Sequence, residues 1–256
     1  TDDTLEPVRM TDTADAIYAN CVYQRLTRLL PSLEVEGDAA EEWSVNAGAT
    51  EWTFKLRSGL TFHNGQNVTS TDVVESLQRH IAEGSESPAK ALLSTVTDID
   101  ALDAMTVKIT MSSGNADLPV IMSDYHLSIH PAGFTNFDMA VGSGPFKVAE
   151  FVPGERVVFE RFDTYYEPSK PYLDGLDFIP VPDANATLSA LLSGDVDIIY
   201  NVPPFAVDQL SANDNVTLHN TPTGSFTNMV MMVDRAPTDN LDFRKGVKHA
   251  LDRELI

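Results

Sequence analysis

The chain has 256 residues, of which 43% are hydrophobic and 21% are charged, a composition typical of one large globular domain or two smaller ones. Its 17 Lys and Arg against 38 Asp and Glu give a net charge of -21, which disfavours nucleic acid and anionic lipid as partners. No apolar run approaches the ~18 residues of a membrane-spanning helix. The single cysteine, Cys21, excludes an internal disulfide and a thiolate metal site.

Helical and extended patterns alternate in the first half of the chain. Apolar residues spaced by three and four predict an amphipathic helix over residues 14–29, ended by Pro31, with Cys21 as a buried thiol. The stretch "WTFKLRSGLTFHNGQNVTSTDV", residues 52–73, predicts a strand, an Asn-Gly turn and the start of a helix, in that order. The helix is expected over residues 71–83 and ends at a glycine.

Further signals mark a helix start and three strands. Thr69 precedes Asp72 by three residues, which is the spacing of a helix cap with an acidic partner. Residues 106–111 alternate as a strand with one buried face. Residues 146–152 and 156–162 are separated by a Pro-Gly-Glu turn and predict a long antiparallel pair.

The pattern changes in the last third of the chain. Residues 176–181 predict a strand, residues 184–193 a short helix, and residues 195–200 a second strand, an order and spacing typical of a βαβ crossover with parallel strands. Residues 226–233 predict another buried strand, and residues 243–256 the start of a helix. Together the patterns predict an α/β protein with mixed sheets in a two-part layout.

Motifs for catalysis or metal binding are weak. His126 and His130 have the spacing of a zinc-binding helix, but the glutamate of that motif is missing and Pro131 disfavours helical geometry. The lone Gly-x-Gly of "GSGPF", residues 142–146, is interpreted as a tight turn that needs glycine backbone angles. The sequence offers no catalytic constellation, metal site or cofactor motif, and favours a binding protein over an enzyme.

The segment quoted above also carries a longer pattern. Residues 52–73 follow the pattern W-x-F-x-L-R-x-G-V-x-F-H-D-G-x-x-hydrophobic-T-A-x-D-V at all but three of its positions. Leu60, Asn64 and Ser70 stand where the pattern has Val, Asp and Ala. This pattern resembles the most recognisable segment of the solute-binding proteins of ABC importers, in the class that binds dipeptides, oligopeptides and nickel. Further blocks resemble that family in the same order: "TLEP" (4–7), "DAAEEWSV" (38–45), "GSGPFKVAEFVPGERVVFERFDTYY" (142–166), "LSALLSGDVDII" (188–199) and "LDFRKGVKHALDRELI" (241–256).

The resemblance implies a periplasmic-binding-protein-like α/β fold. Such proteins have a large lobe with a mixed sheet, an α+β subdomain inserted into that lobe, and a second lobe joined by two hinge strands. By position, residues 1–47 and 145–238 correspond to the split large lobe, and residues 48–144 to the inserted subdomain. Residues 243–256 correspond to the start of the second lobe, most of which we expect to be absent.

The resemblance also implies ligand contacts by position. The candidates are Thr11, Asp12, Thr13, Asp124, Tyr125, His126, Gly224, Ser225 and Phe226. The first three follow the "TLEP" block and equally suit the capping of the next helix. The second three lie between apolar flanks near the lobe junction, and equally suit a buried hydrogen-bonding cluster. The last three precede a hinge strand and are expected to present backbone groups to the cleft.

The implied function is transport rather than catalysis. Such a protein captures peptides or peptide-sized solutes in the periplasm or elsewhere outside the cytoplasmic membrane, and closes two lobes around the ligand. It then delivers the ligand to ABC transporter permease subunits, without a cofactor. Alternatives of the same fold are a receptor for a nickel-type metal chelate, contacted by His126 or His130, and a receptor for an oligosaccharide. A hydrolase is a further hypothesis, disfavoured by the missing catalytic constellation.

Overall fold

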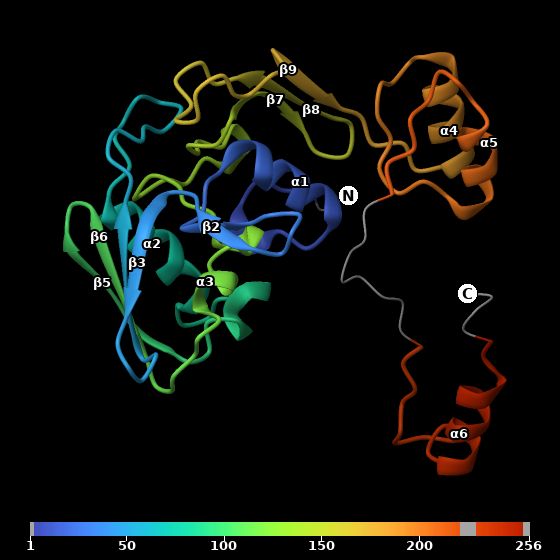
Figure 1. Ribbon diagram of the computed structural model, residues 1–256, viewed down its shortest axis with the longest axis horizontal. Helices are drawn as coiled ribbons and strands as arrows, with labels where there is room; N and C mark the ends of the chain where they lie inside the picture. The colour runs from blue at the N-terminus through green and yellow to red at the C-terminus, as the bar shows by residue number, and fades with distance from the viewer. Residues whose placement is uncertain (1–2, 221–228, 253–256) are drawn as a thin grey trace. The chain divides into compact units, whose positions relative to one another are not determined.

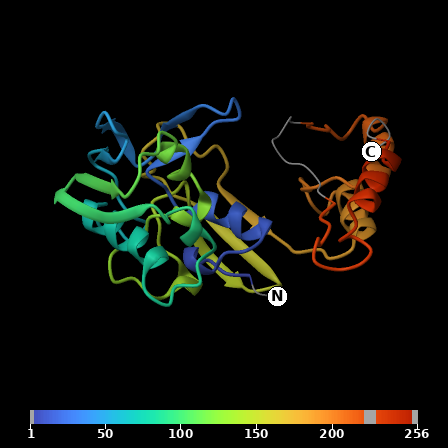
Figure 2. The ribbon, with the colours of Figure 1, turned by 90° about the horizontal axis from the view of Figure 1, so that it is seen from below.

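The computed structural model describes residues 3–220 and 229–252 of the chain. The chain divides into two compact units, Thr1–Pro182 and Asp183–Ile256 (Figure 1; Figure 2). Among the described residues, the first unit holds two clusters of buried hydrophobic side chains and the second holds one small cluster. The lobe boundaries implied by the resemblance are a finer division and stay predictions.

A four-stranded antiparallel sheet forms the larger cluster of the first unit. Its strands run in the order β3-β4-β6-β5, and helix α2 contacts β5 and β6. Burial alternates along β4 and β6, so the strands expected at these positions are confirmed. The bounds are β3 Ala40–Val45, β4 Glu51–Leu56, α2 Ser70–Ile81, β5 Val96–Asp103 and β6 Thr106–Met111.

Helix α2 begins where the sequence predicts. The carboxylate of Asp72 accepts hydrogen bonds from the backbone N–H and the hydroxyl of Thr69, both at 2.7 Å. Its other oxygen accepts from the backbone N–H of Ala132 at 2.8 Å. The capping carboxylate therefore also fastens a distant loop to the start of the helix.

A three-stranded antiparallel sheet, ordered β7-β8-β9, forms the second cluster together with helix α1. The hairpin of β7 and β8 confirms the expected antiparallel pair. The bounds of these and the other elements of the unit are α1 Thr13–Val22, β1 Thr27–Leu29, β2 Val35–Gly37, α3 Leu118–Ile121, β7 Phe146–Val152, β8 Arg156–Arg161 and β9 Gly175–Phe178, with short 3-10 turns η1 Pro7–Arg9, η2 Pro88–Ala91, η3 Tyr125–Leu127 and η4 Phe137–Met139.

The helix expected over residues 14–29 is wrong in its second half. Helix α1 ends at Val22, and the chain then runs extended into β1. The carbonyl oxygens of Arg25 and Leu26 accept hydrogen bonds from the backbone of residues 38–40, at 2.8–3.1 Å. This pairing with a neighbouring segment satisfies the backbone groups that a longer helix would have used, so tertiary contacts override the helical spacing.

The βαβ crossover expected over residues 176–200 is wrong. Strand β9 pairs antiparallel with β8, and neither residues 195–200 nor residues 229–233 form a strand. Ile198 is 80% exposed, because no strand of the described residues lies beside this segment. Residues 226–228 of the last expected strand lie outside the described residues. The helix expected over residues 184–193 is confirmed. The helix expected over residues 243–256 is found as α6, which ends at Ala250, and residues 253–256 lie outside the described residues. The bounds are α4 Ala184–Ser193, η5 Pro204–Ala206, α5 Val207–Ser211 and α6 Leu241–Ala250.

The "GSGPF" glycines owe their presence to close packing rather than to backbone angles. Neither Gly142 nor Gly144 has a positive φ, which corrects the expected turn. The N–H of Gly144 donates to the Val22 carbonyl at 2.8 Å, and a Cβ on either glycine would overlap the backbone of Val22. Glycine is therefore required because this segment lies directly against the end of α1.

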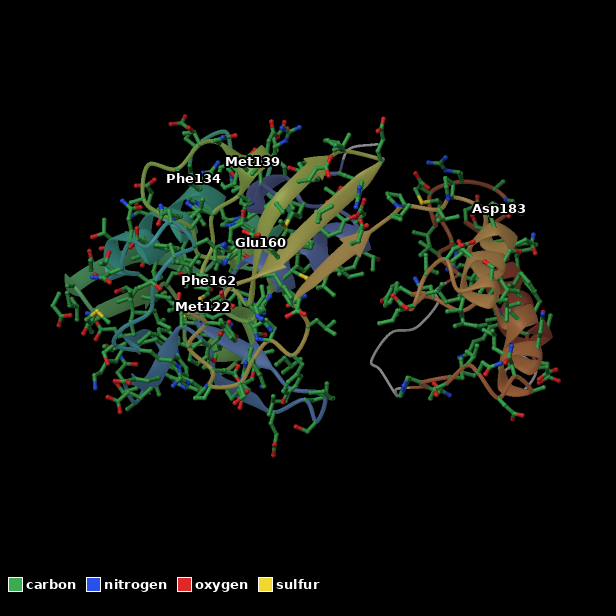
Figure 3. All side chains as sticks on the ribbon, turned by 90° about the horizontal axis from the view of Figure 1, so that it is seen from above. Met122, Phe134, Met139, Glu160, Phe162 and Asp183 are labelled. Carbon is green, nitrogen blue, oxygen red and sulfur yellow. The ribbon has the colours of Figure 1, made fainter. Side chains whose placement is uncertain are left out.

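His63 joins the quoted strand-turn-helix segment to these glycines. Its backbone N–H donates to the Gly142 carbonyl at 2.8 Å, and its ring Nε2 lies 3.0 Å from the Gly144 carbonyl oxygen. Its Nδ1 accepts from the Gly142 N–H at 3.3 Å. The ring meets Phe162, labelled in Figure 3, edge-on at 4.8 Å between centroids. These contacts require a neutral ring with its proton on Nε2.

We expect the neutrality of His63 to make stability depend on pH. Burial lowers the pKa of His63 to about 4, whereas an unfolded histidine has a pKa of about 6.5. The unfolded chain therefore binds the proton first, and the free energy of unfolding falls as the pH falls from about 6.5 to 4. His63→Gln should reduce this loss by about 3 kcal/mol, as measured by urea unfolding at pH 7 and pH 4.

Burial also lowers the pKa of His80 to about 4, so His80 contributes to the same pH dependence. His80→Gln is therefore measured in parallel with the parent and His63→Gln, because removing His80 should remove a separate share of the pH dependence. An unchanged slope between pH 6.5 and 4 in His63→Gln would show that His63 is not held neutral by the fold.

Candidate functional site

The structure brings two of the three predicted groups of ligand contacts together. The 3-10 turn η3 lies against η1 and helix α1, and His126 makes the connection. Its Nε2 lies 3.1 Å from the carbonyl oxygen of Met10, one residue before Thr11, and its Nδ1 lies 2.6 Å from Asp124. His126 is thereby fixed in orientation, and it couples residues 124–126 to the loop before α1.

Asp124 is the charged partner of this histidine. Burial raises the pKa of its carboxyl, but the hydrogen bonds from the His126 ring and backbone N–H outweigh that effect and leave the pKa below its usual value. Asp124 therefore stays ionised at neutral pH. Its oxygen Oδ1 is occupied by His126, so this carboxylate supports the histidine more directly than it faces a ligand.

Tyr125 is the aromatic side chain of the site. Its ring lies 3.9 Å from the His126 ring between centroids, at 30°, and is half-buried against the second hydrophobic cluster. Burial raises the pKa of its hydroxyl, and the negative charges of Asp124, Asp15 and Asp12 act in the same direction. Its hydroxyl makes no hydrogen bond to a described residue. A fixed ring with an unoccupied hydroxyl is suited to contact a solute.

Residues 11–13 are exposed and lead into helix α1, which begins at Thr13. Asp12 is the N-cap, because its Oδ1 accepts from the backbone N–H of Asp15 at 3.0 Å. The capping role weighed for this loop is thus confirmed for Asp12. Whether Thr11, Asp12 and Thr13 also contact a ligand stays a prediction.

The acidic residue Asp15, which sequence patterns did not single out, organises this loop. It is fully buried, and burial raises its pKa although three backbone N–H groups lower it. Two of these donors are Thr4 at 3.1 Å and Thr11 at 2.8 Å. Asp3, Asp12 and Asp15 are the group within the described residues whose spacing could hold a metal ion. The oxygens of Asp15 are already occupied by backbone donors, so the geometry gives no support for a cation there.

The two histidines of the zinc-like spacing have separate partners. His130 is buried, with Nδ1 directed at the Pro131 carbonyl oxygen at 3.0 Å and Nε2 accepting from Arg79 at 3.2 Å. Neither His126 nor His130 belongs to a potential metal-binding group within the described part of the chain. Gly224, Ser225 and Phe226, the third predicted group, lie outside the described residues.

Comparisons with known proteins identify the class. Residues 34–256 match the model of bacterial extracellular solute-binding proteins, family 5 Middle. The chain belongs to this family, the family 5 solute-binding proteins of ABC transporters. No helix in the described ranges is both long and apolar enough to cross a membrane.

Individual relatives place the chain more closely. It is 26% identical to the glutathione-binding protein GsiB of Escherichia coli K12 over 99% of this chain and 51% of that protein. The chain therefore spans about half the length of the curated relatives it matches. The structure of AgaA from A. tumefaciens R10 in complex with agropinic acid is similar with a TM-score of 0.80 and 30% identity, over 84% of this chain and 45% of that one.

A third relative supports the fold alone. The dipeptide-binding protein of Pseudoalteromonas sp. SM9913 in complex with Met-Leu matches with a TM-score of 0.84 and 19% identity, over 99% of this chain and 56% of that one. The periplasmic-binding-protein-like fold expected from the sequence is thus confirmed. The names of these relatives include a glutathione-binding protein, a dipeptide-binding protein in complex with Met-Leu, and a protein in complex with agropinic acid.

Proposed function

We propose that the chain captures peptides or peptide-sized solutes outside the cytoplasmic membrane and presents them to ABC transporter permease subunits, without chemical change. The observation that carries the proposal is the assembly of an exposed loop, residues 11–13, with Tyr125, through the contact of His126 with Met10. This face offers backbone and hydroxyl groups beside an aromatic ring, the mixture that small-solute sites use. The names of the relatives support the solute class.

The proposal is tested by calorimetry on the protein expressed from its complete reading frame. The panel consists of glutathione, Met-Leu, agropinic acid, a nickel chelate and a neutral oligosaccharide. Saturable binding of a peptide, recovered unchanged by chromatography, supports the proposal. Binding restricted to the chelate or the oligosaccharide would select the corresponding alternative receptor, and conversion of a bound peptide to products would select the hydrolase.

Within this proposal, Tyr125→Ala should weaken binding of the peptide by about 1–3 kcal/mol, because a positioned aromatic ring and its hydroxyl are lost. The melting temperature should change little, since the ring is only half-buried. Calorimetry and thermal melting are measured on the same variant.

The matched control is Leu102→Ala, which removes an exposed side chain of β5 and should change neither quantity. Intact peptide affinity together with a large fall in melting temperature would make Tyr125 a packing residue, and would remove residues 124–126 from the site.

A further inference from the structure

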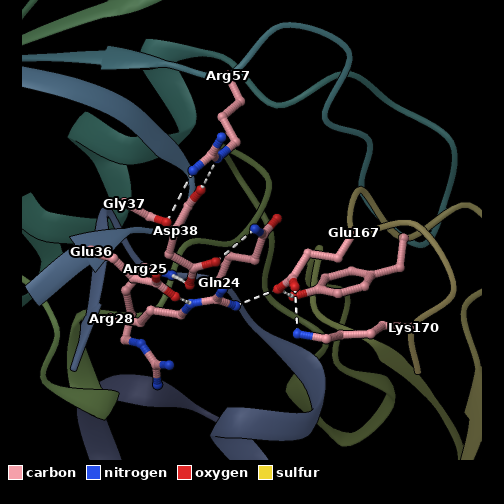
Figure 4. A network of polar contacts seen from close by, with 10 residues as sticks. Gln24, Arg25, Arg28, Glu36, Gly37, Asp38, Arg57, Glu167 and Lys170 are labelled. Atoms are coloured by element: carbon pink, nitrogen blue, oxygen red, sulfur yellow. Dashed lines mark hydrogen bonds and ion pairs between the residues drawn. The ribbon is translucent and has the colours of Figure 1, made fainter. Parts of the chain in front are cut away.

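A network of charges lies between the β1–β2 hairpin and the loop that precedes β9. Arg28 of β1 is paired with both Glu36 of β2 and Glu167 of the loop (Figure 4). Lys170 adds a second cation on Glu167 at 2.6 Å. These two cations and two carboxylates neutralise one another, so this half of the network has no need of an outside partner.

The other half of the network holds one cation that forms no ion pair within the described residues. Asp38 accepts from the Gln24 side chain at 2.8 Å and from the backbone N–H of Arg25 at 3.0 Å (Figure 4). The Arg25 guanidinium makes no ion pair with a carboxylate of the described residues. Its hydrogen bond within the described chain runs from Nη1 to Asn20 at 2.8 Å, and its buried Nε has no partner.

Arg25 is only 8% exposed, so its guanidinium is largely removed from water. An arginine presents five N–H donors in a fixed planar fork, and leaving one of them, here the Nε–H, without a partner in a buried position is unfavourable. Burial lowers the pKa of Arg25, and the negative charges of Asp38 and Asp124 oppose this effect. A buried cation with idle donors is suited to receive an anion.

Arg25 lines a cavity of about 470 Å³ that lies wholly within the first unit. This volume falls in the range of about 300–1,000 Å³ usual for small-ligand pockets. Its lining also includes the exposed apolar side chains Leu29, Tyr172 and Leu173, and the half-buried Tyr165. The cavity thus combines apolar side chains with the Arg25 guanidinium, whose hydrogen-bond donors are not all used.

We propose that this cavity is a second ligand site, separate from the candidate site at residues 124–126, and that it binds a small monocarboxylate with an apolar substituent. The carboxylate accepts hydrogen bonds from the part of the Arg25 guanidinium that lines the cavity, and the substituent lies against Tyr172 and Leu173. The proposal stands on the geometry around Arg25 and does not depend on the solute that the candidate site takes.

Charge in the cavity selects the class of anion. The lining includes three cations, Arg25, Arg28 and Lys170, and two carboxylates, Asp38 and Glu167, so its formal charge is +1 within a chain of net charge -21. A monocarboxylate balances this charge, whereas a phosphate with nearly two negative charges exceeds it. The apolar rim favours an anion that carries a hydrophobic group over a bare inorganic ion.

The test observes the Arg25 Nε–H directly in the 256-residue chain by proton–nitrogen correlation NMR. Phenylacetate is titrated as the probe, with phenylacetamide as its neutral match and inorganic phosphate as the dianion. We expect phenylacetate to shift the Arg25 Nε–H signal in a saturable way with a Kd on the order of millimolar, as suits so small a ligand. The amide and phosphate should give no saturable shift.

Arg25→Lys keeps the positive charge but lacks the Nε–H fork. It assigns the signal by its loss, and should weaken phenylacetate binding at least about tenfold. Arg156→Gln, which removes an exposed arginine of β8 paired with Asp177, should leave the affinity unchanged. No saturable shift with phenylacetate, an equal shift with phenylacetamide, tighter binding of phosphate, or full affinity in Arg25→Lys would each overturn the proposal. The wild-type titrations decide the matter if Arg25→Lys does not fold.

Discussion

We expect Trp52→Ala to lower the free energy of unfolding by about 3–5 kcal/mol, the usual cost of deleting a buried tryptophan from a core. Trp52 is 5% exposed on β4, opposite Val45 of β3 and Ile109 of β6. Its ring stacks on Phe54 at 6.3 Å between centroids and 21°. Alanine would leave a cavity in the middle of the four-stranded sheet. Urea unfolding of the variant and the parent measures the effect.

Trp52→Phe provides the companion measurement, because the Trp52 Nε1 is buried and has no partner among the described residues. Phenylalanine removes this unmet donor while filling much of the space, so it should cost clearly less than alanine. Leu102→Ala on the exposed side of β5 should stay within about 0.5 kcal/mol of the parent. A Trp52→Ala variant that unfolds at the parent's urea concentration would place this tryptophan outside the core.

Gly142→Ala should cost about 3 kcal/mol or prevent folding, because the new methyl group has no space. It would overlap the carbonyl oxygen of Val22 and lie 2.7 Å from the Tyr23 ring. The Val22 carbonyl cannot withdraw without losing its hydrogen bond from Gly144, at 2.8 Å. Thermal melting and urea unfolding of the variant measure the loss.

Gly48→Ala is the matched control in the same unit. Gly48 has no positive φ, and a methyl group there would meet its nearest neighbour, Thr50, at 3.6 Å, an ordinary contact distance. This variant should therefore be neutral or slightly stabilised, since alanine restricts the unfolded chain more than glycine does. Equal stability of Gly142→Ala and Gly48→Ala would contradict the close approach of residue 142 to α1.

The parts of the fold that depend on local pattern could be predicted from the sequence. Alternation identified β4, β6 and the β7–β8 hairpin, and Thr69 with Asp72 marked the start of α2. These features involve residues close together in the chain. The extended run after Val22 could not be predicted in this way, because it depends on hydrogen bonds with residues 38–40. The expected crossover failed for a related reason, since a strand needs a neighbour that sequence pattern does not supply.

The candidate site could likewise be predicted only in part from the sequence. Resemblance to a family selected residues 11–13 and 124–126, and the structure joins these segments through His126 and Met10. Asp15 and Arg25 were missed, because their significance lies in burial and in which partners they have or lack. No motif or spacing in a single sequence reports these tertiary properties. Arginine is usually exposed, and nothing in the residues around Arg25 predicts that it is buried.

The contacts of His63 with Gly142 and Gly144 have a topological consequence. They hold together two points of the chain separated by nearly eighty residues. The segment between these two points includes α2, β5 and β6. Insertions or deletions in the loops of this segment need not move the strands on either side, because its two ends, at His63 and at Gly142, are held together by these hydrogen bonds. The loops of the segment between them can therefore diverge in length, while β6 keeps its register with β4.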